Sequence, residues 1–241
     1  AVVDVSPDRP SGIYLAGYTT RKSKSIHDPI TARCAVIDDG TTKLAIVTTD
    51  VIGLFYLDTK AIADKASQLS GVPAGNILVH AIHTHSAPDT QGLWGGSSKA
   101  YKQKFIEGAA SCVQQAAADM KPVTTWIAQG EVSGYAINRR NPATKISDPV
   151  LAVMEFRDSS GKAIFTLTNF ACHAVVLGVD NLEMTADYVY YLRKKLEQER
   201  GGTALFVMRD IGDANPVAIH ADVYDRGGGT FEMAEKLGNG L

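Results

Sequence analysis

The stretch NILVHAIHTHSAPD, residues 76–89, is the one from which the fold is most directly inferred. Its apolar run from Ile77 to Ile82 has the length of a buried β-strand, and it ends in His-Thr-His and a turn signal. The segment TALFVM, residues 203–208, is apolar in the same way. Strands that are apolar on both faces are typical of the middle of a sheet covered by helices on both sides. We therefore expect 77–83 and 203–208 to be central strands.

Helix-like segments separate several strand-like segments along the rest of the chain. Further strands are expected at 32–38, 43–51, 124–130, 150–156 and 163–170, and helices at 59–70, 99–119, 186–200 and from about 230 to 241. Asp58 or Thr59 is expected to cap the first of these helices, and Thr185 the third. The alternation predicts a layered α/β fold, with a mixed, largely buried sheet flanked by helices.

Composition excludes several classes of protein. The chain has 241 residues, 45 % of them hydrophobic, and a formal net charge of -2, so it presents no basic field for nucleic acid or anionic lipid. Its apolar runs are too short to span a membrane. The three cysteines, Cys34, Cys112 and Cys172, lie in apolar segments and are expected to be buried thiols. The chain begins Ala-Val-Val-Asp without Met, from which we expect a secreted or periplasmic protein.

Three of the six histidines, His80, His83 and His85, fall within six positions at the end of the 77–83 strand. If the extended backbone continues, His83 and His85 lie on one face, and His80 faces the opposite layer as a structural residue. Two imidazoles on one strand end form a suitable pair of zinc ligands. The motif alone is equally compatible with two structural histidines.

Polar side chains also follow other predicted strands. His173 comes after 163–170, Asp210 and Asp213 come after 203–208, and Asp50 ends the 43–49 strand. Each alone has a simpler interpretation, as a core histidine or as turn chemistry. Together they lie at the carboxyl ends of strands, where α/β sheets bind ligands.

Two further segments carry charged residues. Arg139 and Arg140 lie in INRRNPATKISDP, residues 137–149, which is either a solvated loop or a binding site for an oxyanion or carboxylate. Asp187 is expected in the first turn of a helix, where its charge favours the helix dipole without any other role.

The motifs resemble those of the neutral/alkaline ceramidase family, in family order and from about residue 12 to the end. They are AGY (16–18), ARCAVIDDG (32–40), IVTTDVIGL (46–54), HTHSAPD (83–89), INRRNP (137–142), SDPVLAVMEF (147–156), NFACHAVVL (169–177), MTADY (184–188) and GDANP (212–216). The resemblance is to the N-terminal, catalytic-type domain of the family. It implies a zinc-dependent amidase acting on a small-molecule or lipid N-acyl substrate.

The resemblance also implies roles for four residues. His83 and His173 correspond to zinc (Zn2+) ligands, His85 to a histidine that assists catalysis, and Arg139 to an arginine that contacts substrate near the scissile group. These roles agree with general chemistry. Zinc activates water and polarises a carbonyl, a histidine transfers a proton to the leaving amine, and an arginine stabilises an oxyanion.

The sequence departs from the family pattern in one respect. The family completes its zinc site with a Glu and a Tyr further along the chain, and this sequence stops at KLGNGL before such a segment. Two histidines alone make a weak zinc site, and Asp187, Asp213 or His220 are candidates for a third ligand. We expect residues 1–241 to form one ceramidase-like N-terminal α/β domain, truncated at its C-terminus.

The leading hypothesis is a zinc-dependent hydrolase that cleaves an amide bond in ceramide-like or other N-acyl substrates. Two alternatives remain open at this point. One is a non-catalytic binding module that retains the fold with an incomplete metal site. The other is a metal-dependent esterase or phosphoesterase that uses the same edge of the sheet.

Overall fold

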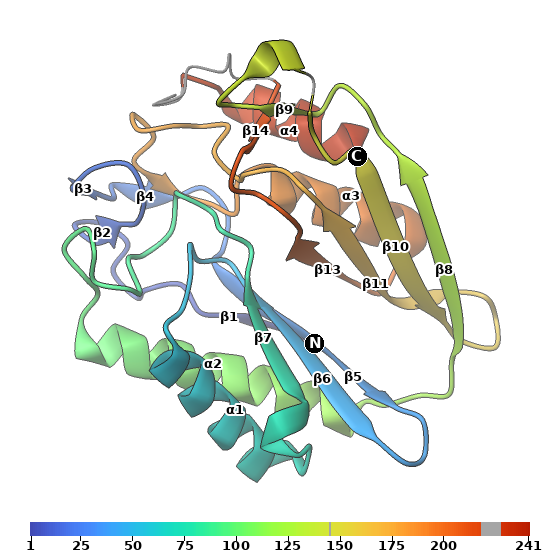
Figure 1. The fold of residues 1–241 in the computed structure, drawn as a ribbon. Coiled ribbons are helices and arrows are strands. Elements are labelled where there is room, and N and C mark those ends of the chain that lie inside the picture. Colours follow the sequence, from blue (N-terminus) through green and yellow to red (C-terminus); the bar gives the residue numbers. More distant parts are fainter. Residues whose placement is uncertain (145, 218–227) are drawn as a thin grey trace.

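The computed structural model describes residues 1–144, 146–217 and 228–241, in which two four-stranded sheets are covered by helices (Figure 1). The first sheet has the order β1 (Val2–Asp4), β5 (Thr31–Asp38), β6 (Lys43–Thr49), β7 (Ile77–Ala81). The second has the order β13 (Thr203–Met208), β11 (Ala163–Phe170), β10 (Val150–Arg157), β8 (Thr124–Glu131). The pairs β6–β7 and β11–β13 are parallel, and the other neighbours are antiparallel. Both sheets are therefore mixed, and the predicted layered α/β fold is confirmed.

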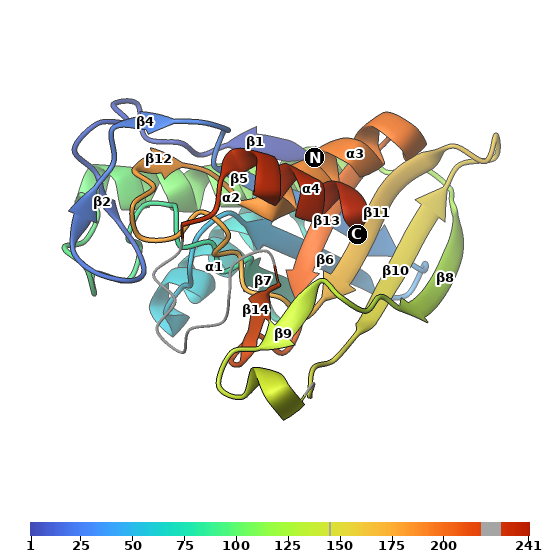
Figure 2. The ribbon, with the colours of Figure 1, turned by 90° about the horizontal axis from the view of Figure 1, so that it is seen from above.

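Among the described residues, three hydrophobic cores lie between the layers. One packs the first sheet against α1 (Tyr56–Ser70) and α2 (Lys99–Ala118), and another packs the second sheet against α3 (Tyr188–Arg200) and α4 (Phe231–Gly240). The third joins the two sheets through Ala35, Ile46, Phe156, Phe165 and Leu205. The layers therefore follow the order helices, sheet, sheet, helices, and Figure 2 shows α3 and α4 side by side.

The expected central position of two strands is wrong. β7 and β13 are both edge strands of their sheets. β13 is apolar on both faces because Phe206 packs towards the helices while its neighbour Leu205 packs towards the other sheet. In β7, Leu78 is 53 % exposed. The apolar run of β13 thus reflects burial between two layers at a sheet edge, whereas that of β7 is partly exposed, so an apolar run does not by itself indicate a central strand.

Several short elements do not appear in the sequence pattern, because two or three residues show no periodicity. Short ladders join β2 (Tyr14–Leu15) to β3 (Arg21–Lys22), β12 (Glu183–Met184) to β4 (Ser25–Ile26), and β14 (Ala214–Pro216) to β9 (Ala136–Asn138). Two 3-10 turns are η1 (Ala74–Asn76) and η2 (Pro142–Thr144). The β9–β14 ladder brings the INRR and DANP segments together (Figure 2).

Helix boundaries differ from the prediction at two N-termini. α1 begins at Tyr56 after Phe55, which makes no side-chain cap, so Asp58 lies in the first turn and neither it nor Thr59 is the N-cap. α3 begins at Tyr188, and its cap is the Asp187 carboxylate instead of Thr185. At α2 and α4, Ser98 and Thr230 accept a backbone N–H as N-caps normally do.

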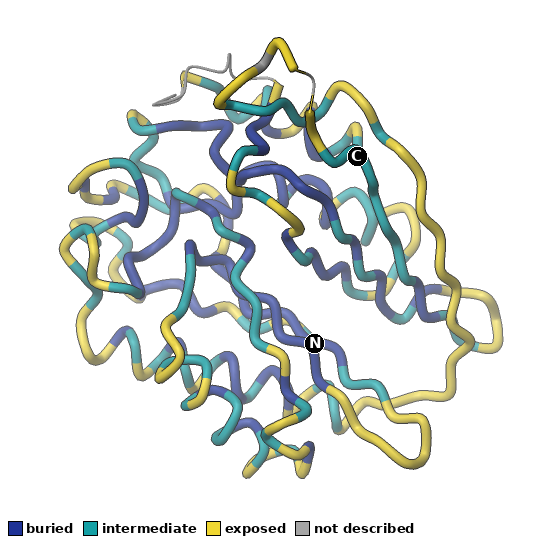
Figure 3. Tube along the Cα trace, viewed as in Figure 1, coloured by how far each residue is buried: buried dark blue, intermediate teal, exposed yellow. Residues whose placement is uncertain are grey.

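Other expectations can be compared directly with the structure. The three cysteines are free and buried, as predicted. No helix among the described residues is long and apolar enough to cross a membrane. β8 is exposed along its whole length (Figure 3), which leaves one edge of the second sheet open.

Candidate metal centre

His83, His85 and His173 come together in space. Their ring centroids are 5.1 Å apart for His83–His85, 4.9 Å for His83–His173 and 5.6 Å for His85–His173. One ring nitrogen of each lies within 4.8 Å of those of the other two. The end of β7 therefore meets the end of β11, although the two strands belong to different sheets. Of the five strand-end residues expected along one sheet edge, these three histidines lie together, and they come from two sheets.

The backbone reaches this arrangement by a turn, so the condition that the extended backbone continues through His85 is not met, and the strand ends before the expected residue 83. β7 ends at Ala81, and His83 has a positive φ of 62°. A non-glycine residue in this conformation is uncommon and is found where surrounding contacts hold it. Here the His83 N–H donates to the Val51 carbonyl at 3.0 Å, and Nδ1 lies 2.7 Å from the Ile52 carbonyl. A carbonyl only accepts, so Nδ1 carries the proton and Nε2 presents its lone pair.

The other two histidines have ring nitrogens without hydrogen-bond partners. Three buried ring nitrogens have no hydrogen-bond partner among the described residues. They are Nδ1 and Nε2 of His85 and Nδ1 of His173. Their backbones are held, since the N–H of His85 donates to Ala174 at 3.3 Å and that of His173 to Ala214 at 2.8 Å. Buried polar atoms are normally paired, so converging unpaired imidazole nitrogens fit a metal ion. The ligand set suits zinc.

The environment keeps these imidazoles neutral. Burial lowers the pKa of His173 to about 4, with the charge of His83 as a smaller cause. Burial likewise lowers the pKa of His83, and it lowers that of His85 well below the usual value, helped by the other two histidines. A neutral imidazole is the form that binds a metal.

The positive charge of Arg139 is among the causes that lower the pKa of all three histidines, so Arg139 lies within electrostatic range of the cluster. It directly follows β9, and its backbone N–H donates to the Asp213 carbonyl at 2.8 Å. The adjacent Arg140 forms an exposed ion pair with Asp213, Nε to Oδ1 at 2.7 Å. Arg139, Arg140 and Asp213 were candidate site residues from the sequence. The β9–β14 ladder brings the two segments that carry them together.

The remaining predicted residues have other partners. Asp187 caps α3, accepting from the Tyr188 N–H at 2.7 Å and the Leu177 N–H at 3.2 Å, and burial raises its pKa to about 6. Asp187 and Asp213 do not belong to the three-histidine group found among the described residues. His80 is structural, as predicted, since its Nε2 accepts from the Met208 N–H at 2.8 Å.

Three candidates remain. Asp210 is exposed, and Asp50 is buried in an ion pair with Arg193. His220 lies outside the described residues.

The sequence pattern did not predict the roles of Gly17, Tyr18 and Arg21. Gly17 has φ 78°, and its backbone packs so closely on the His85 ring that an added Cβ would lie 2.6 Å from Cγ. Tyr18, with φ 58°, places its ring edge-on to His85 at 4.9 Å. The buried Arg21 guanidinium donates to the carbonyl of His85 and, at 3.0 Å, to that of Ala16. The AGY motif, residues 16–18, was a signal for Gly17 and Tyr18, and Arg21 lies outside it.

Comparison with known proteins identifies the family to which the chain belongs. The sequence profile of the N-terminal region of neutral/alkaline non-lysosomal ceramidases matches residues 8–218. Because that match covers most of the chain, the protein belongs to this family.

Two solved structures have the same fold. Neutral ceramidase from Pseudomonas aeruginosa is 21 % identical with a TM-score of 0.82, and the match covers 99 % of this chain and 42 % of that protein. A structure described as ceramidase complexed with C2 is 20 % identical with a TM-score of 0.84, and the match covers 99 % of this chain and 41 % of that one. This chain therefore spans about two fifths of the length of either ceramidase.

Proposed function

We propose that the protein is a zinc-dependent hydrolase that cleaves the amide bond of ceramide-like or other N-acyl substrates. The observation that carries the proposal is the convergence of three imidazoles whose pKa values are lowered by burial. Both ring nitrogens of His85 and Nδ1 of His173 lack partners among the described residues. Membership of the ceramidase family supports the reaction class.

We assign His83 and His173 as the metal ligands. His83 fits this role because the Ile52 carbonyl fixes the proton on Nδ1 and leaves the Nε2 lone pair free. His173 contributes a ring in contact with that of His83, from a backbone held by Ala214. A bound zinc ion lowers the pKa of water towards neutrality and polarises the carbonyl of an amide.

His85 and Arg139 are assigned to the reacting groups. His85 has two ring nitrogens without partners, so one of them can receive a proton from water and deliver it to the leaving amine. Arg139 brings a positive charge to the same place, where it stabilises the negative charge that develops on the amide oxygen.

The assignment is tested by two measurements on matched variants, the zinc content per chain and the hydrolysis of an N-acyl sphingosine. We expect His83→Ala and His173→Ala to lose both zinc and turnover, and His85→Ala to keep zinc but lose turnover. His27→Gln is the control, since His27 stacks on Phe231 outside the cluster and should retain both properties. Intact hydrolysis in the His83/His173 double variant would refute the proposal.

Two other outcomes would change the assignment. Zinc binding that requires all three histidines would make His85 a third ligand, and Arg139 would then remain as the only reacting group named here. Zinc binding without turnover on amide, ester and phosphoester substrates would favour a non-catalytic binding module. That alternative is motivated by the fact that the chain spans only about two fifths of the ceramidases of known structure.

A further inference from the structure

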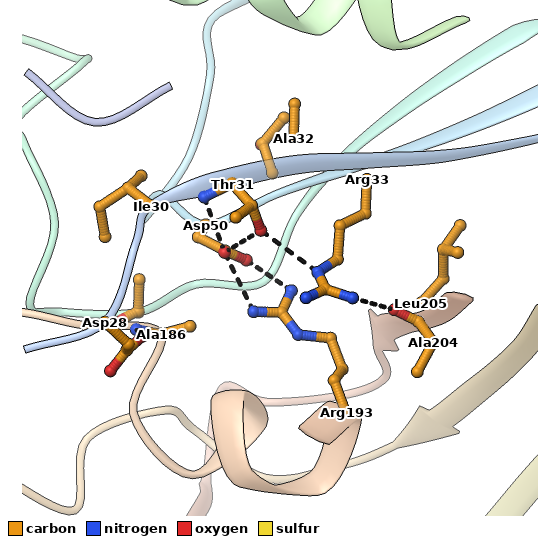
Figure 4. Close-up of polar contacts among 12 residues, drawn as sticks. Asp28, Ile30, Thr31, Ala32, Arg33, Asp50, Ala186, Arg193, Ala204 and Leu205 are labelled. Carbon is orange, nitrogen blue, oxygen red and sulfur yellow. Dashed lines mark hydrogen bonds and ion pairs between the residues drawn. The ribbon is translucent and has the colours of Figure 1, made fainter. Parts of the chain in front are cut away.

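A fully buried ion pair joins the end of β6 to helix α3 (Figure 4). Asp50 and Arg193 have side chains that are 0 % and 1 % exposed. The guanidinium donates to both carboxylate oxygens, from Nη1 to Oδ1 at 2.7 Å and from Nη2 to Oδ2 at 3.0 Å. Oδ2 also accepts from the N–H and the hydroxyl of Thr31, at 2.9 and 2.6 Å. The carboxylate is thus fixed from two sides by groups on different elements.

On one side, the pair holds the segment that positions His83. Asp50 directly follows β6, and the next two residues, Val51 and Ile52, provide the carbonyls that accept from the His83 backbone N–H and from Nδ1. A shift of Asp50 would therefore move both hydrogen bonds that orient the His83 ring.

On the other side, the pair holds the helix that positions the His173 segment. Arg193 belongs to α3, whose first residue Tyr188 donates its hydroxyl to the Cys172 carbonyl at 2.8 Å. The helix cap Asp187 accepts from the N–H of Leu177 at 3.2 Å. The helix is therefore bonded on both sides of His173.

Arg33 extends the same cluster to the second sheet. Its Nε donates to the Thr31 hydroxyl at 3.2 Å and its Nη1 to the carbonyl of Ala204 in β13 at 3.1 Å (Figure 4). Its guanidinium also pairs with Glu197 of α3. The buried charges thus lie where the part of the fold that carries His83 meets the part that carries His173.

Stability alone is a weak explanation for these charges. Removing two ions from water is costly, and apolar side chains of similar volume often give equal or greater stability. A bidentate Arg–carboxylate pair, in contrast, fixes both distance and orientation. A site that needs nitrogens from two separate segments within 4.8 Å benefits from such a constraint.

We propose that Asp50 and Arg193 form a positioning pair, which sets the His83 ring relative to His173 so that the metal centre is formed before the ion binds. The inference rests on the proposed metal centre where metal affinity is measured. The protonation state of the His83 ring can be measured without metal and tests the positioning role independently.

The test compares Arg193→Met with Arg200→Met. Arg200 lies two turns along the same helix and makes its own bidentate pair with Glu155, at 2.9 and 3.0 Å. Imidazole 15N spectra of the metal-free protein report which His83 nitrogen carries the proton, and Co2+ titration reports metal affinity. We expect Arg193→Met to lose the fixed Nδ1-protonated form of His83 and to bind Co2+ at least tenfold more weakly. Arg200→Met should match the parent in both.

A folded Arg193→Met protein with the parent's His83 spectrum and Co2+ affinity would overturn the proposal. Asp50→Asn provides the answer if Arg193→Met does not fold, because it keeps the shape and the acceptor for Thr31 while removing the charge. The same two readouts apply, and parent-like values would again overturn it. A parent that binds no Co2+ would refute the metal centre, while a changed His83 spectrum in the variants would still support the positioning role.

Discussion

His80 provides the sharpest quantitative prediction, since its ring links β7 of the first sheet to β13 of the second. Its Nε2 accepts from the Met208 N–H of β13 at 2.8 Å. Protonation of Nε2 would turn this acceptor into a donor that faces the Met208 N–H. It would also place a positive charge where burial disfavours any charge. Burial, with the charge of His83 as a smaller cause, lowers the pKa of His80 from 6.5 to about 4.

The sign and size of the effect follow from proton linkage. Between pH 6.5 and 4, the unfolded chain binds a proton at this residue that the folded protein does not bind. The free energy of unfolding is therefore highest above pH 6.5 and decreases as the pH falls towards 4. A pKa difference of one is worth about 1.4 kcal/mol, so the shift of His80 is worth about 3.5 kcal/mol in full, of which about 3 kcal/mol is lost by pH 4.

The assay is urea unfolding of the parent and of His80→Gln at several pH values between 7.5 and 4. Glutamine retains an acceptor for Met208 and does not titrate, and the other histidines are common to both proteins. We expect the stability of the parent relative to the variant to fall by about 2–3 kcal/mol over this range. A difference that does not change with pH would refute the reasoning, whatever its absolute size.

Four other substitutions have definite expected outcomes. Gly17→Ala should lower stability by about 1–3 kcal/mol and weaken Co2+ binding, because its Cβ would collide with His85. Gly12 also has a positive φ, 83°, but an added Cβ there would meet only open space. Gly12→Ala should therefore cost only about 1 kcal/mol in stability and leave Co2+ affinity unchanged. Ser98→Ala removes the N-cap of α2 and should cost about 1 kcal/mol in urea unfolding. Asp89→Asn weakens four backbone bonds to a buried carboxylate and should cost about 1–3 kcal/mol, with faster amide exchange in loop 91–96.

Long periodic segments could be predicted from the sequence, and their exact ends could not. The apolar patterns located β11, β13 and the main body of all four helices close to their observed bounds. The start of α3 was misplaced because Thr185 and Asp187 are both good N-cap residues, and the choice depends on contacts made elsewhere. Asp187 also accepts from Leu177, and Thr185 donates its hydroxyl to Asp28. Such distant partners leave no local signal.

The candidate site divides in the same way. His83, His85 and His173 could be selected because each follows an apolar strand. Gly17 and Arg21 could not be selected in this way, because they act only through contacts with His85. The Gly17 backbone packs on the His85 ring, and the Arg21 guanidinium donates to the His85 carbonyl. The pairing of Asp50 with Arg193, which are 143 positions apart, is likewise invisible in the sequence.

The sequence by itself determined where the long strands and the four helices lie and which histidines follow the strands, because those properties depend on local periodicity and residue chemistry. Only the tertiary structure decided that the strands form two sheets and that β7 and β13 are edges. It also decided that His83 leaves the strand by a left-handed turn to meet His173. The physical reason is that layer packing and the convergence of ring nitrogens depend on contacts between distant segments, which residue order alone does not specify.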